Sequence, residues 1–73
     1  PLAFRINGMD CAEEVAVLKR EVGPAVGGEA NLSFDVMNAK MTVAAGAGVT
    51  ADAVAAAVAR TGMTAEPWRD EKS

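Results

Sequence analysis

Four short stretches of the chain alternate hydrophobic and polar residues, which is the pattern of half-buried β-strands. They are residues 2–7, 32–36, 40–43 and 63–68. In the first stretch Leu2, Phe4 and Ile6 share one side, and polar side chains share the other. The chain therefore predicts four strands, each with one face directed at a core.

Two longer stretches carry hydrophobic residues at helical spacing. The first lies between Asp10 and Gly23, where Asp10 is a good N-cap residue and Glu13 completes a capping-box pattern. The hydrophobic face of this predicted helix comprises Ala12, Val15, Leu18 and Val22. The second predicted helix follows Thr50, another good N-cap residue, and ends before Gly62. Its inward positions are Val54, Ala57, Val58 and Thr61.

Glycine, proline and asparagine separate these elements. Residues 24–29 predict a loop and residues 37–39 a turn, in which Asn38 tolerates a left-handed conformation. The order β-α-β-β-α-β is that of the split βαβ, ferredoxin-like pattern. We therefore expect an α+β sandwich, with two helices on one face of a four-stranded antiparallel sheet. The domain is expected to span residues 1–68, and residues 69–73 to form a charged tail or linker.

The composition narrows the chemistry of the chain. Its 73 residues suffice for one small domain, and a single cysteine allows no internal disulfide. The lack of histidine excludes Ser-His-Asp catalysis and histidine metal sites within this sequence. The net charge of −3 argues against nucleic acid as a partner. No stretch approaches the roughly 18–20 apolar residues of a membrane helix, and a start at Pro1 suggests a segment of a longer protein.

The residues with the most reactive side chains lie between the first predicted strand and helix. Cys11 would occupy the first helical turn, where unpaired N–H groups favour a thiolate. Glu14 follows three residues later on the same helical face, and Asp10 precedes the helix. The carboxylates oppose ionisation of the thiol, and a bound cation would remove that conflict. We assign Glu13 to the capping box or to solvent, and Met9 to the core.

The segment Gly8-Met9-Asp10-Cys11-Ala12-Glu13-Glu14 resembles the G-M-x-C-x-x-C loop of the heavy-metal-associated domain family. In that family the loop binds the metal, and here Glu14 stands in place of the second cysteine. This variant is similar to loops of zinc-, cadmium- and lead-exporting P-type ATPases. The resemblance implies Cys11, Glu14 and Asp10 as metal ligands, although Asp10 is equally well explained as the N-cap alone.

The ligand types indicate which ion to expect. Cu(I) favours two thiolates, whereas one thiolate with two carboxylates suits Zn(II), with Cd(II) or Pb(II) as alternatives. The resemblance further implies a metal-binding domain at the cytoplasmic face of a membrane, whose partners are the ion and the membrane and ATPase domains of the same parent chain. We expect no enzymatic activity of this fragment and a monomer, with a metal-bridged dimer as the alternative.

Two other functions agree with the same sequence. One is a metal-free docking or autoinhibitory domain that has lost the second cysteine. The other is a free-standing metallochaperone.

Overall fold

The computed structural model describes residues 2–69 and has the expected order of strands and helices. These elements are β1 (Leu2–Asn7), α1 (Ala12–Val22), β2 (Leu32–Asp35), β3 (Lys40–Val43), α2 (Ala51–Ala59) and β4 (Thr64–Pro67). Pro1 of the predicted domain and residues 70–73 of the predicted tail lie outside the described residues.

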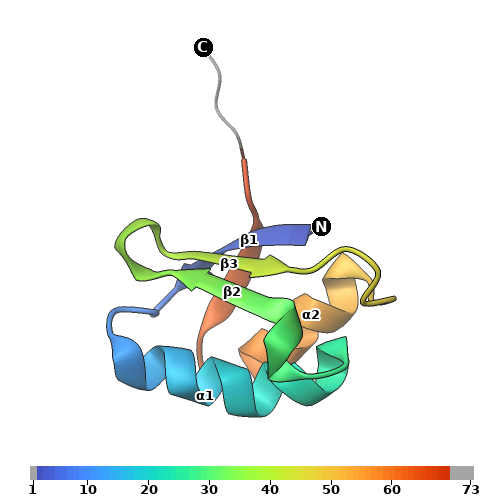
Figure 1. Ribbon diagram of the computed structural model, residues 1–73. Coiled ribbons are helices and arrows are strands. Elements are labelled where there is room, and N and C mark those ends of the chain that lie inside the picture. Colours follow the sequence, from blue (N-terminus) through green and yellow to red (C-terminus); the bar gives the residue numbers. More distant parts are fainter. Residues whose placement is uncertain (1, 70–73) are drawn as a thin grey trace.

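The four strands form one antiparallel sheet in the order β2-β3-β1-β4. Both helices cover the same face of this sheet, and no helix or strand of residues 2–69 covers the other (Figure 1). The predicted α+β, ferredoxin-like arrangement is therefore confirmed. Among residues 2–69 no helix has the length and apolar character needed to cross a membrane.

The core lies between the sheet and the helices, and the alternation of the strands explains its composition. Phe4 and Ile6 of β1 are buried, and Met9 is only 2% exposed, as predicted. Val26 is also fully buried, although its segment was predicted to be a loop. It belongs to a 3-10 turn, Gly23–Val26, which continues directly from α1.

Two local predictions are wrong, those for Val36 and Ala12. Val36 does not extend β2, but begins the 3-10 turn Val36–Asn38 and is exposed. Asn38 would tolerate the left-handed conformation of this turn, but Ala39 takes it, with φ of 54°, and the Asn38 side chain donates to Asp35 Oδ2 at 2.8 Å. Ala12 is exposed, since it lies in the first turn of α1 next to the loop from β1.

Candidate metal centre

The loop between β1 and α1 is anchored at its start, directly after β1. Gly8 follows β1 with φ of +103°, a conformation that side-chain-bearing residues rarely adopt. A Cβ atom at Gly8 would lie 3.0 Å from Cγ of Met63, so the backbone passes close to this buried side chain. Met9 then enters the core. The loop consequently presents residues 10–14 at the surface from a fixed starting point.

The N-cap of α1 is Cys11, and the prediction of Asp10 is wrong. The helix begins at Ala12, one residue later than a cap at Asp10 requires, and Cys11 has an extended backbone. The capping-box carboxylate is consequently Glu14 rather than Glu13. Its Oε1 accepts the backbone N–H of Cys11 at 3.1 Å and so satisfies a donor at the helix start.

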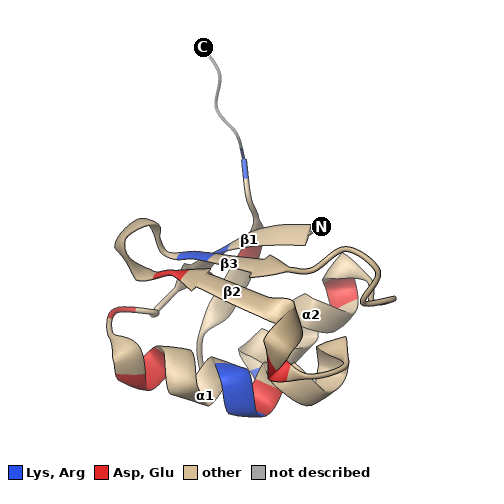
Figure 2. Ribbon diagram, viewed as in Figure 1, with Lys and Arg blue, Asp and Glu red and all other residues tan. Residues whose placement is uncertain are grey.

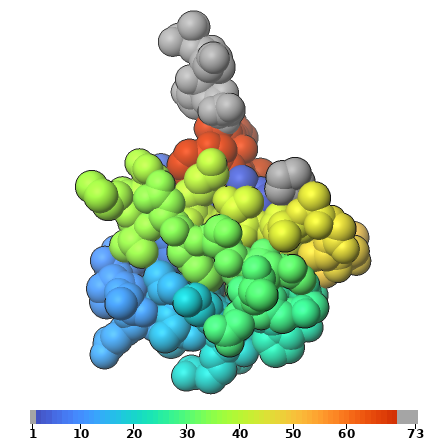
Figure 3. All heavy atoms as spheres, in the orientation of Figure 1, coloured from blue at the N-terminus to red at the C-terminus, as the bar shows by residue number. Residues whose placement is uncertain are grey.

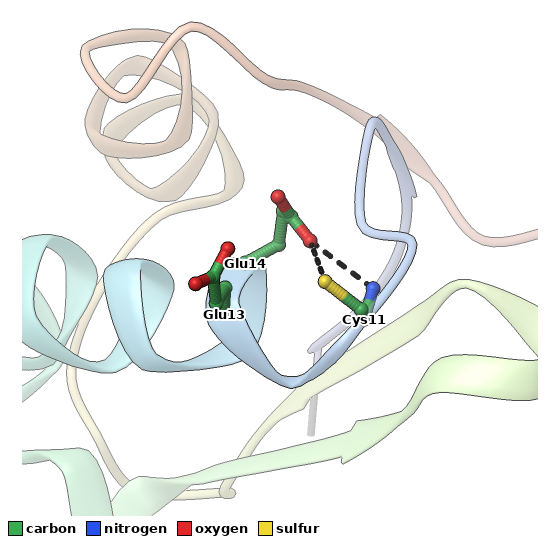
Figure 4. A group of neighbouring side chains, drawn as sticks. All are labelled: Cys11, Glu13 and Glu14. Carbon is green, nitrogen blue, oxygen red and sulfur yellow. Dashed lines mark hydrogen bonds between the residues drawn. The ribbon is translucent and has the colours of Figure 1, made fainter.

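The same carboxylate oxygen also accepts the thiol of Cys11. The distance from Cys11 Sγ to Glu14 Oε1 is 2.7 Å, and both side chains point toward one another beside the first turn of α1 (Figure 4). This hydrogen bond is the main reason why the pKa of Glu14 lies below its ordinary value. Loss of hydration raises that pKa and backbone hydrogen bonds lower it further. Glu14 is therefore ionised at neutral pH and available as a ligand.

Glu13 does not take part in the capping box but is exposed, the other alternative of its assignment, and its carboxylate lies close to this pair. One ligand atom from each of Cys11, Glu13 and Glu14 lies within 4.8 Å of the other two. Asp10 is exposed and is not part of this group. The sequence did carry a signal for Glu13, because an acidic residue anywhere in the first helical turn lies close to the N-cap side chain.

The charges of this group are not balanced by a nearby basic side chain. Within residues 2–69 the only ion pair closer than 4 Å joins Arg20 and Glu21, in the last turn of α1. A thiolate at Cys11 would therefore face the carboxylates of Glu13 and Glu14 with only the helix N-terminus to offset them. A divalent cation would bring the missing positive charge.

An ion could enter this group with a small movement of side chains. At a tetrahedral ion with bonds of about 2.3 Å to sulfur and about 2.1 Å to oxygen, the two ligand atoms lie about 3.6 Å apart. The Cys11–Glu14 contact of 2.7 Å would have to lengthen by about 1 Å, and the thiol would lose its proton. Since Cys11 is exposed, this requires no opening of the core.

The turn between β2 and β3 lies at the same end of the molecule as the loop. Ala39 of this turn accepts the backbone N–H of Ile6 at 2.8 Å, close to the end of β1. Met37, at the tip, is 96% exposed. Figure 3 shows the turn (yellow-green) projecting beyond the start of α1 (blue). The group is thus open to solvent and to other proteins.

Comparisons with protein families, curated proteins and solved structures found no match for this chain.

Proposed function

We propose that this chain is a metal-binding domain that takes a divalent ion, Zn(II) first and Cd(II) or Pb(II) as alternatives, at Cys11 and Glu14. The observation that carries the proposal is the contact of 2.7 Å between Cys11 Sγ and Glu14 Oε1, with the Glu13 carboxylate within 4.8 Å. One sulfur and two carboxylate oxygens at one point are a ligand set that divalent ions accept and Cu(I) does not prefer.

The role of the domain follows from the resemblance of residues 8–14 to the loops of zinc-, cadmium- and lead-exporting P-type ATPases. In such a parent protein the domain would deliver the ion to the membrane domain or regulate transport. An exposed site with three protein ligands supports either role, because a position remains open for water or for a ligand of the acceptor.

Two possible ligand sets differ in the residue that supplies the third ligand. The resemblance implies Asp10, whereas the geometry favours Glu13, whose carboxylate already lies in the group. If Glu13 is the third ligand, Glu13→Gln will weaken Zn(II) binding by about 10-fold or more, and Asp10→Asn will weaken it only slightly. Titration with Zn(II) under chelator competition measures both, and the matched control is Glu21→Gln in the last turn of α1.

If Asp10→Asn weakens Zn(II) binding much more than Glu13→Gln does, Asp10 is the third ligand. Equal, small losses for both variants and for the Glu21 control would contradict a three-ligand site. Cu(I) binding that matches Zn(II) binding and does not respond to Glu14→Gln would contradict the divalent ion itself.

Metal affinity is expected to rise with pH between about pH 6 and about pH 8, with release of about one proton per ion. The proton comes from the Cys11 thiol, since the thiolate is the ligand. Glu14 adds nothing to this slope, because its lowered pKa keeps it ionised throughout the range. Calorimetry in two buffers of different ionisation enthalpy measures the released protons. An affinity independent of pH would contradict coordination by Cys11.

One observation also favours the metal-free docking domain. Glu14 already accepts both the N–H and the thiol of Cys11, so the loop is internally hydrogen-bonded without an ion. The reduced peptide acetyl-Asp-Cys-Ala-Glu-Glu-amide separates the two functions. If the folded chain binds Zn(II) no more tightly than this peptide, the docking function is the better account.

A further inference from the structure

The open face of the sheet carries a row of four charged residues, one on each strand. In register across the sheet, Asp35 of β2 pairs with Lys40 of β3, Lys40 with Arg5 of β1, and Arg5 with Glu66 of β4. Three strand spacings make this row about 14–15 Å wide. Its two cations are neighbours at the centre and its two acids lie at the ends.

The two acids are engaged by neutral amides instead of by the cations beside them. Glu66 Oε2 accepts Asn7 Nδ2 at 2.9 Å, and Asp35 Oδ2 accepts Asn38 Nδ2 at 2.8 Å. Among residues 2–69, neither Arg5 nor Lys40 lies within 4 Å of a carboxylate oxygen. The cations at the centre of the row therefore keep their charge available to another molecule.

Trp68 adds an aromatic surface to these cations. Its ring is half-buried, with Lys40 Nζ 4.8 Å from the ring centroid, and its backbone N–H donates to Ala3 at 2.9 Å. Beside it lies a hollow of about 300 Å³, lined by Arg5, Glu66, Pro67, Trp68 and Arg69. Figure 2 shows the basic segments of β1 and β3, and a further one just beyond β4, on this side of the molecule.

We propose that the open face around Trp68 is a docking surface for an acidic segment of a partner polypeptide, whose carboxylates meet Arg5, Lys40 and Arg69. Tryptophan and arginine are the residues most enriched among those that dominate binding energy at protein interfaces. The guanidinium groups suit carboxylates in particular, because they form two parallel hydrogen bonds with them.

Two other polyanions fit this surface less well. Nucleic acid presents a continuous row of phosphates, which would meet Asp35 and Glu66 at the ends of the charged row. A single tryptophan also provides no series of stacking positions for bases. An anionic bilayer attracts runs of basic residues over a broad surface, whereas here the cations are confined between acids. A short acidic segment can contact the centre alone.

Trp68 is the only tryptophan of the chain, so its indole N–H gives one resolved signal in a proton–nitrogen NMR spectrum. The probe is an acetylated hexa-glutamate peptide, with hexa-lysine as the peptide of opposite charge. We expect hexa-glutamate to shift the indole signal and the amide signals of Arg5 and Lys40. Arg5→Gln and Lys40→Gln should each weaken binding roughly two- to fivefold. The matched control, Lys19→Gln in the last turn of α1, should leave it unchanged.

Three outcomes would overturn the proposal. The first is equal weakening by Lys19→Gln, which would mean attraction to any cation of the chain. The second is a response to hexa-lysine as large as that to hexa-glutamate. The third is binding to vesicles of one part phosphatidylserine and three parts phosphatidylcholine without binding of hexa-glutamate, which would identify a membrane surface instead. The amide spectrum of each variant shows whether that variant is folded, and so distinguishes loss of binding from loss of folding.

Discussion

Replacement of Cys11 by alanine is expected to lower the affinity for Zn(II) by more than about 100-fold, while the fold persists. Loss of an outer-shell partner alone costs metal sites roughly 10- to 100-fold, and Cys11 supplies the only thiolate available to this site. The side chain is exposed and packs in no part of the core, so the thermal unfolding temperature should change little. Chelator competition and circular dichroism measure the two quantities on the same sample.

The matched control for this variant is Met37→Ala. It removes another sulfur atom at the same end of the molecule, from a side chain that is 96% exposed. Zn(II) affinity should be unchanged in that variant. If Met37→Ala weakens binding as much as Cys11→Ala, the thioether belongs to the site and the ligand set proposed here is wrong. If neither variant weakens Zn(II) binding, the ion binds elsewhere.

Replacement of Gly8 by alanine is expected to destabilise the domain by about 2–3 kcal/mol. A left-handed backbone costs a residue with a side chain about 1–2 kcal/mol, and the Gly8 φ of +103° lies beyond that region. The added Cβ would also lie 3.0 Å from Met63 Cγ, and displacing a buried side chain costs about 1 kcal/mol or more. For a domain of this size the midpoint temperature should fall by roughly 10–20 °C.

Gly62→Ala is the matched control for Gly8→Ala. Gly62 has a similar φ of +93°, but nothing lies within 4 Å of a Cβ atom built there. Gly62→Ala should therefore lower the free energy of unfolding only by the backbone contribution of about 1–2 kcal/mol. Urea denaturation of both variants gives the difference directly. A loss at Gly8 no larger than at Gly62 would show that the passage of the loop against Met63 imposes no constraint.

The strands and helices could be predicted because their patterns are local. Alternation in β1 and helical spacing in α1 indicate most of the side chains that enter the core, and both ends of β1 and the C-terminal end of α1 agree with expectation. The segment around Val26 could not be predicted in this way. Two glycines and a proline suggest a loop, yet Val26 is completely buried, and the turn that carries it contacts α2, which is distant in sequence.

Which residues belong to the candidate site depends on whether α1 begins directly after Asp10 or one residue later, and the sequence leaves this open. Asp10 is the better N-cap residue by type, so a helix starting after it is the simpler prediction. The structure starts the helix one residue later, and Glu14 rather than Glu13 then caps it. That shift also moves Asp10 out of the group and brings Glu13 into it. Cys11 and Glu14 lie on the same side of the helix whichever residue is the N-cap, because they are three residues apart.

X-ray absorption at the zinc edge shows directly which atoms hold the ion, on a reduced chain loaded with one equivalent of Zn(II). We expect one sulfur at about 2.3 Å and the remaining ligands as oxygen at about 2.0–2.2 Å. A shell that contains only oxygen and nitrogen would contradict coordination by Cys11. A shell with two sulfur atoms would contradict the proposed ligand set, in which Cys11 supplies the only sulfur.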